Sequence, residues 1–111
     1  MNRRLAAVVL ATALATAALV VPAIGAGSGA SLHDNFFAPK RLVVTRGGTV
    51  TWRWRGVNEH NVTVRRGPVR FHSSTKTAGT FGRKLTKPGT YRIVCTIHEF
   101  SDNMRMTVVV R

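Results

Sequence analysis

Short runs of alternating apolar and polar residues constrain the fold of this 111-residue chain more than any other feature. The clearest run spans residues 49–55, where Val50, Trp52 and Trp54 would point to one face of a strand and the residues between them to the other. Glycine and proline pairs separate such runs, and no helical period of useful length follows residue 30. The pattern predicts an all-β fold, a Greek-key β-sandwich of about seven strands.

The expected strands cover residues 31–37, 41–45, 49–55, 61–66, 80–85, 91–95 and 104–110, with an ambiguous short one at 70–73. Because Trp52 and Trp54 share a face with Val50, we expect both rings in the core rather than stacked on nucleic-acid bases.

The first thirty residues have the layout of a secretory signal peptide. A basic start is followed by an uncharged apolar run from Leu5 to Val21 and by a segment of small residues that ends at Ala30. We predict a signal-peptide helix in residues 1–30, cleavage at a site within 23–30, and one folded domain of residues 31–111. An uncleaved membrane anchor is the alternative, since the apolar run is near the lower limit of a span. Either way the domain is exported, to the periplasm or the cell exterior.

The chain is strongly basic, with 17 Lys and Arg against 4 Asp and Glu and a net charge of +13. Such a surface attracts anionic partners, of which acidic redox proteins and an anionic membrane or cell-wall surface fit best. Nucleic acid is disfavoured because the basic residues are scattered and the chain is expected to be exported. A solvated surface without a dedicated partner is the plainer interpretation.

Cys95 is the only cysteine, so no disulfide forms within one chain. Exported proteins meet oxidising surroundings. A lone cysteine there indicates a metal ligand, an intermolecular bridge or a reactive thiol, although a thiol that only packs in the core stays open. Cysteine-protease activity is disfavoured because nothing in the sequence marks an oxyanion hole.

Three further residues can complete a metal site with Cys95. His98 follows at Cys-x-x-His spacing, Met104 begins the last strand, and His60 begins an earlier one. Strand alternation places Cys95, His60 and Met104 on apolar faces, where a site at one end of a sandwich draws its side chains. One thiolate, two imidazoles and a thioether are the ligand set of blue-copper electron-transfer sites, whereas a zinc site more usually has a second Cys or His and no Met.

From Asn35 to Val110 the sequence resembles a small plastocyanin- or amicyanin-like cupredoxin. The matching segments, in order, are Phe37-Ala38-Pro39, Gly47-Gly48-Thr49-Val50-Thr51-Trp52, His60-Asn61-Val62, Phe71-His72-Ser73-Ser74, Gly79-Thr80-Phe81, Pro88-Gly89-Thr90-Tyr91, Cys95-x-x-His98 and Met104 before a valine strand. The resemblance implies a cupredoxin fold and a monomeric carrier of single electrons, not an enzyme, whose one copper ion cycles between Cu(I) and Cu(II).

The resemblance also implies roles for individual residues. The ligands in the copper plane would be His60, Cys95 and His98. Met104 would be the long axial ligand. Asn61 would stiffen the site by hydrogen bonding beside the sulfur, with Thr96 as its partner. Electrons would pass through the exposed ring edge of His98.

Two features of the last loop leave alternatives open. Five residues separate His98 from Met104, more than in close relatives, so Met106 or no strong axial ligand is the alternative. Glu99, beside His98, would be available to a cationic partner. The alternative functions are a copper-binding module for buffering or delivery, and a metal-free immunoglobulin-like interaction domain.

Overall fold

A computed structural model describes residues 27–111, so the predicted signal peptide of residues 1–30 lies almost wholly outside the described part. Residues 27–111 contain eight strands: β1 (Ser28–His33), β2 (Phe36–Ala38), β3 (Arg41–Val44), β4 (Thr49–Trp54), β5 (Thr63–Arg66), β6 (Thr80–Lys84), β7 (Gly89–Val94) and β8 (Arg105–Val110). None of these residues belongs to a helix long and apolar enough to cross a membrane.

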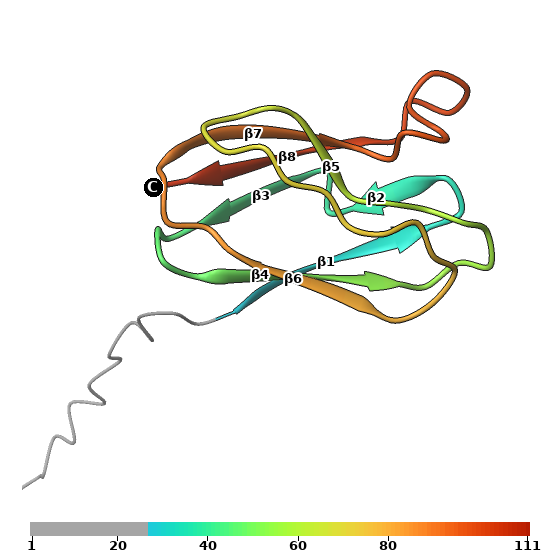
Figure 1. Cartoon of the computed structure of the whole chain (residues 1–111), viewed down its shortest axis with the longest axis horizontal. Helices are drawn as coiled ribbons and strands as arrows, with labels where there is room; N and C mark the ends of the chain where they lie inside the picture. Colours follow the sequence, from blue (N-terminus) through green and yellow to red (C-terminus); the bar gives the residue numbers. More distant parts are fainter. Residues whose placement is uncertain (1–26) are drawn as a thin grey trace, which may run out of the picture.

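The strands form two four-stranded sheets that lie one above the other (Figure 1). One sheet has the order β2-β1-β4-β6, and the other has the order β3-β8-β7-β5. Pairing is parallel between β1 and β4 and between β3 and β8, and antiparallel elsewhere. The all-β sandwich predicted from the sequence is confirmed.

One apolar core fills the space between the sheets, and the alternation in the sequence identifies most of it. Val50, Trp52 and Trp54 of β4 are all buried, as expected from residues 49–55. Tyr91 and Ile93 of β7 face them from the other sheet and are fully buried. Burial of one such large side chain stabilises the fold by roughly 1.5–3 kcal/mol, so the sandwich depends on this alternation being kept.

Two strand predictions need correction, those for residues 31–37 and 70–73. The first strand begins at Ser28 instead of residue 31, because its backbone pairs in parallel with β4 from Ser28 opposite Val50 onward. It also ends at His33, and a two-residue turn separates it from β2. Residues 70–73 form no strand, and His72 makes only an isolated bridge to Thr63. Gly67 and Pro68 end β5 and disfavour continued strand pairing in the segment that follows.

Strand β5 carries a bulge that the sequence pattern did not predict. Val64 lies opposite Ile93 and Arg66 lies opposite Arg92, so Arg65 is an extra residue in the ladder. A bulge brings two successive residues toward the same side of a sheet. Arg65 and Arg66 are accordingly both exposed, which breaks the alternation expected for residues 61–66.

The two ends of the sandwich differ in character. At one end, which we call the loop pole, the turn at residues 34–35, the loop 55–62 and the loop 95–104 come together on the right of Figure 1. Contacts of His60 with Asp34 and with His98 join these three segments. At the opposite end, the far pole, lie the start of β1 and the C-terminal residue Arg111.

Candidate metal centre

The loop pole brings together three donor atoms from residues distant in the chain. His60 Nδ1 lies 3.2 Å from His98 Nδ1 and 3.8 Å from Cys95 Sγ, and Cys95 Sγ lies 3.6 Å from His98 Nδ1. Within residues 27–111, these three residues form the one such cluster of His, Cys and acidic side chains. Edges of this length suit atoms that share one ion at bonds of about 2.0–2.3 Å. The cluster therefore fits a single metal ion.

Backbone hydrogen bonds fix the positions of the three side chains. Cys95 follows β7, and its N–H donates to the Met104 carbonyl at 3.2 Å. His98 N–H donates back to the Cys95 carbonyl at 3.2 Å, and this tight turn brings the His98 Nδ1 atom to 3.6 Å from the sulfur. His60 forms a two-bond bridge with Lys76, at 3.0 and 3.1 Å, just before β5.

The three residues differ in how far they are exposed to solvent. His60 and Cys95 are both 0% exposed, whereas His98 is partly exposed. A thiolate shielded from water is protected against oxidation and side reactions. The partly exposed imidazole is the member of the cluster that reaches the molecular surface.

Asp34, which the sequence did not suggest, sets the orientation of the His60 ring. Its Oδ1 lies 2.9 Å from His60 Nε2, and the N–H groups of Val57 and Asn58 donate to the same carboxylate, each at 2.9 Å. These two backbone bonds, then the His60 ring, lower the pKa of Asp34 from 3.8 to about 2. An ionised carboxylate only accepts, so His60 Nε2–H donates to it, and Nδ1 is the ring nitrogen that faces the cluster.

Gly56 allows this arrangement through a close approach. A Cβ atom at Gly56 would lie 2.8 Å from the Asp34 backbone nitrogen and still closer to the Asp34 carboxylate. Real Cβ atoms do not approach backbone so closely, so the 34–35 turn and the 55–62 loop can meet only with glycine at this position.

Asn61 and Thr96 form the contact that the resemblance implied. Asn61 Nδ2 donates to Thr96 Oγ1 at 2.8 Å, and Thr96 N–H donates to Asn61 Oδ1 at 3.1 Å. The Asn61 amide also donates to Thr75 Oγ1 at 3.2 Å. These reciprocal bonds clamp the segment after His60 to the segment after Cys95, so the two ligand-bearing loops hold one spacing.

The two methionines have different surroundings. Met104 is fully buried, and its backbone is hydrogen-bonded to two of the candidate ligands. Its N–H donates to the His98 carbonyl at 3.3 Å, and its carbonyl accepts the Cys95 N–H. Met106 lies two residues later, within β8, opposite Ile93. Its Sδ accepts the Trp52 Nε1–H at 3.3 Å, so this sulfur is engaged in the core. The structure therefore favours Met104 over Met106 for an axial role, which stays a prediction.

Glu99 is not available to a partner, contrary to expectation. It is 3% exposed, and both of its carboxylate oxygens accept hydrogen bonds from the Arg65 guanidinium, one of them from Nε at 3.1 Å. Arg65 lowers the pKa of Glu99 below its ordinary value. The reason is the fold of the 95–104 loop, which turns this side chain inward onto the sheet.

Comparison with known proteins agrees with this geometry. The profile of the family "Copper binding proteins, plastocyanin/azurin family" matches residues 25–111. A reduced amicyanin variant is 29% identical, with a TM-score of 0.66 over 77% of this chain and 82% of that chain. No curated protein matches the sequence significantly.

Two more distant structures show the fold alone. The purple cupredoxin from Nitrosopumilus maritimus is 21% identical, with a TM-score of 0.66 over 76% of this chain and 99% of its own. The copper-containing nitrite reductase from Thermus scotoductus SA-01 is 23% identical, with a TM-score of 0.65 over 77% of this chain. This chain spans only 22% of the reductase.

The profile match, the amicyanin likeness and the donor set agree on the cofactor. A cysteine sulfur and two imidazoles at one buried corner suit copper, and the cluster can hold one ion. The resemblance to plastocyanin- and amicyanin-like cupredoxins is thereby confirmed. This chain belongs to the plastocyanin/azurin family of copper-binding proteins.

Proposed function

We propose that this protein is an exported type 1 copper protein that carries single electrons, with no catalytic activity of its own. The observation that carries the proposal is the triangle of His60 Nδ1, Cys95 Sγ and His98 Nδ1, with edges of 3.2 to 3.8 Å. Two of these residues are buried and one reaches the surface. Amicyanin, the relative with 29% identity, has been obtained in a reduced state, which supports a redox role for this site.

In this proposal His60, Cys95 and His98 hold the ion, and Met104 supplies a weak fourth contact. Copper supplies the one-electron step between Cu(I) and Cu(II). The protein does the rest: Asp34 fixes the His60 ring, the Asn61–Thr96 clamp fixes the spacing of the loops, and the core keeps water from the sulfur. A site held rigidly needs little rearrangement when the oxidation state changes. His98 offers the surface edge through which the electron passes.

Addition of Cu(II) to the purified protein tests the proposal. We expect an intense visible thiolate-to-copper absorption band that is lost in Cys95→Ser and in His98→Ala. His72→Ala is the matched control and should keep the band, because His72 is exposed and lies outside the cluster. A colourless protein that binds only Cu(I) would favour copper buffering or delivery instead. No copper binding at all would favour a metal-free interaction domain.

Export is proposed from the layout of residues 1–30, and β1 narrows the expected cleavage site. A cut after Ala30 would remove Ser28, Gly29 and Ala30, which pair with β4. We therefore expect cleavage after Ala23, Gly25 or Ala26. N-terminal sequencing of the protein recovered from the cell exterior or periplasm tests this, and a first residue of Ser31 would contradict it.

A further inference from the structure

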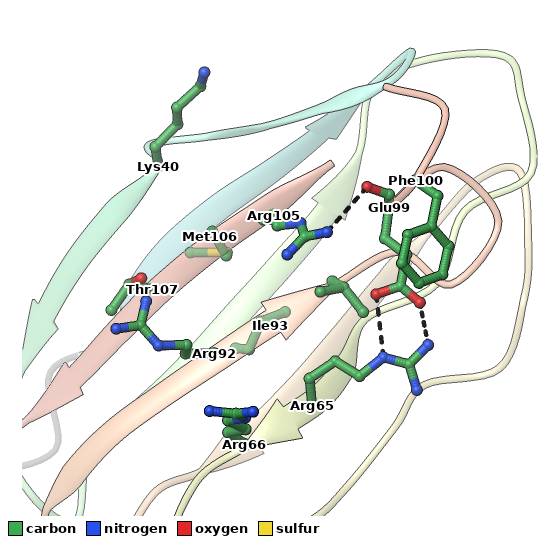
Figure 2. A pocket seen from close by; sticks show the side chains of 11 residues that line it. Lys40, Arg65, Arg66, Arg92, Ile93, Glu99, Phe100, Arg105, Met106 and Thr107 are labelled. Atoms are coloured by element: carbon green, nitrogen blue, oxygen red, sulfur yellow. Dashed lines mark hydrogen bonds and ion pairs between the residues drawn. The ribbon is translucent and has the colours of Figure 1, made fainter. Parts of the chain in front are cut away.

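A basic groove crosses the outer face of the β5–β7–β8 sheet, close to the loop pole (Figure 2). It has a volume of about 510 Å³. Five cationic side chains line it, none of which belongs to the copper site: Lys40, Arg65, Arg66, Arg92 and Arg105. Phe100, which is 84% exposed, forms one end of it. The groove thus combines several cations with an aromatic ring in one hollow.

The fold places several positive charges close together in this groove, and their mutual repulsion destabilises the folded protein. The β5 bulge turns Arg66 outward beside Arg65, and the ladder then places Arg66 directly opposite Arg92. Like charges directly opposite each other on neighbouring strands are destabilising. The Lys40 carbonyl accepts the Thr107 N–H at 2.8 Å, which fixes the backbone at a third cation. An external anion would relieve this repulsion.

The groove has little negative charge of its own. Glu99 is the one acidic residue that lines it, and its carboxylate is already bonded to Arg65. Across residues 27–111, neither Lys40, Arg66 nor Arg92 forms an ion pair with a carboxylate. Three cations in one hollow are therefore free to bind an external anion.

We propose that this groove is the docking site for an acidic segment of a partner protein, which the proposed function makes the redox partner. Guanidinium groups bind carboxylates through two parallel hydrogen bonds. The hollow suits a protruding peptide segment better than a flat bilayer, and the exposed Phe100 ring adds an apolar contact. Glu99 and Phe100 follow His98 directly, so a partner seated here lies beside the histidine that reaches the surface.

A peptide titration tests the assignment. The probe is a synthetic octaglutamate peptide, added at low ionic strength to the metal-free and Cu(I) proteins and followed by amide chemical shifts in NMR spectra. We expect shifts at β5, β7 and Phe100. Arg66→Gln/Arg92→Gln should weaken binding by about tenfold, as expected for loss of two bidentate contacts. Arg53→Gln/Arg55→Gln removes the same charge from exposed positions in and just after β4 and should weaken binding by no more than about twofold.

Three results would overturn the assignment. Equal weakening in both double variants would show that the peptide responds only to net charge. Groove-dependent binding to phosphatidylglycerol vesicles without groove-dependent peptide binding would assign the site to a membrane surface. Inorganic phosphate that shifts the groove amides while the peptide does not would make it a phosphate site. Because the metal-free protein is used, failure here leaves the proposed electron transfer intact, and failure to form the copper band leaves peptide binding intact.

Discussion

At the scale of single residues, Asp34 determines which ring nitrogen of His60 faces the cysteine sulfur. The carboxylate holds the Nε2–H and is itself fixed by two backbone N–H groups. A carboxylate hydrogen-bonded to a ligand histidine makes the imidazole a stronger donor. It also places a negative charge near the ion, which favours the more positive oxidation state, Cu(II).

We therefore predict that Asp34→Asn raises the reduction potential. Asparagine can still accept the Nε2–H, so the ring orientation is kept while the charge is lost. The expected rise is some tens of millivolts, where about 59 mV is a tenfold change in a one-electron equilibrium. Voltammetry of the copper protein measures it. Glu59→Gln, which removes an exposed charge next to His60 in sequence, is the control and should leave the potential almost unchanged.

Voltammetry also distinguishes the roles of the two methionines. Met104→Leu should raise the potential and alter the visible spectrum, because the axial ligand tunes both in blue-copper sites. Met106→Leu should leave the potential unchanged. It should cost about 1 kcal/mol in the free energy of unfolding, because leucine cannot accept the Trp52 N–H. A change in potential with Met106→Leu alone would reverse the axial assignment.

Sequence reasoning reached some of these residues and missed others for physical reasons. Cys-x-x-His spacing and strand phase directed attention to Cys95, His98 and His60, since a short turn and a strand face are local properties. The Asp34–His60 contact joins residues 26 positions apart and depends on how two loops meet. The inward turn of Glu99 likewise depends on the path of the whole 95–104 loop.

At the scale of elements, the 95–104 loop explains how a long segment still returns Met104 to the site. The His98 carbonyl accepts both the Asp102 N–H at 3.0 Å and the Met104 N–H at 3.3 Å, so the loop closes on His98. Asn103 makes the last turn with a φ of 52°, in the left-handed region. Asparagine is among the few residues that adopt this conformation readily.

We predict that Asn103→Ala destabilises the protein by about 1 kcal/mol, whereas Asn103→Gly is close to neutral. Chemical denaturation of the metal-free protein measures both. The pair isolates the backbone effect, since each variant removes the same side-chain amide. Equal losses would mean that the amide itself, and not the left-handed conformation, stabilises the turn.

At this scale, the sequence best predicted which segments form strands. It predicted least well where each strand ends and where a bulge occurs. Runs such as 49–55 carry their own alternation, so β4 follows from the residues alone. The start of β1 at Ser28 depends on its parallel pairing with β4, which no local pattern reveals. The β5 bulge depends on the register against β7.

At the scale of the whole molecule, the metal site occupies one end of the apolar core, and most of the core lies beyond it. The buried apolar cluster extends from Val110 and Val44 near the far pole to Cys95 at the loop pole. Most of the apolar burial that stabilises the sandwich therefore lies away from the copper ligands. This separation predicts a protein that stays folded without metal and gains stability from it.

Removal of copper should leave the far-ultraviolet circular dichroism of the β-sandwich intact. Copper at about 100 times its dissociation constant should stabilise the fold by about 2.7 kcal/mol, which raises Tm by about 10 °C or more for a domain of this size. Calorimetry with and without copper measures the shift. Cys95→Ser is the control and should show little or no increase in Tm. Unfolding on metal removal would contradict the predicted independence of the core.

The direction of β1 has a practical consequence for joining this protein to a fusion partner or to a surface. The first described strand leaves the far pole and runs toward the loop pole, and Arg111 also ends at the far pole (Figure 1). A fusion partner, surface anchor or electrode linker joined at either end of the sandwich is therefore attached on the side remote from His98. In tethered molecules the point of attachment would therefore lie opposite the histidine edge, which stays open to a redox partner.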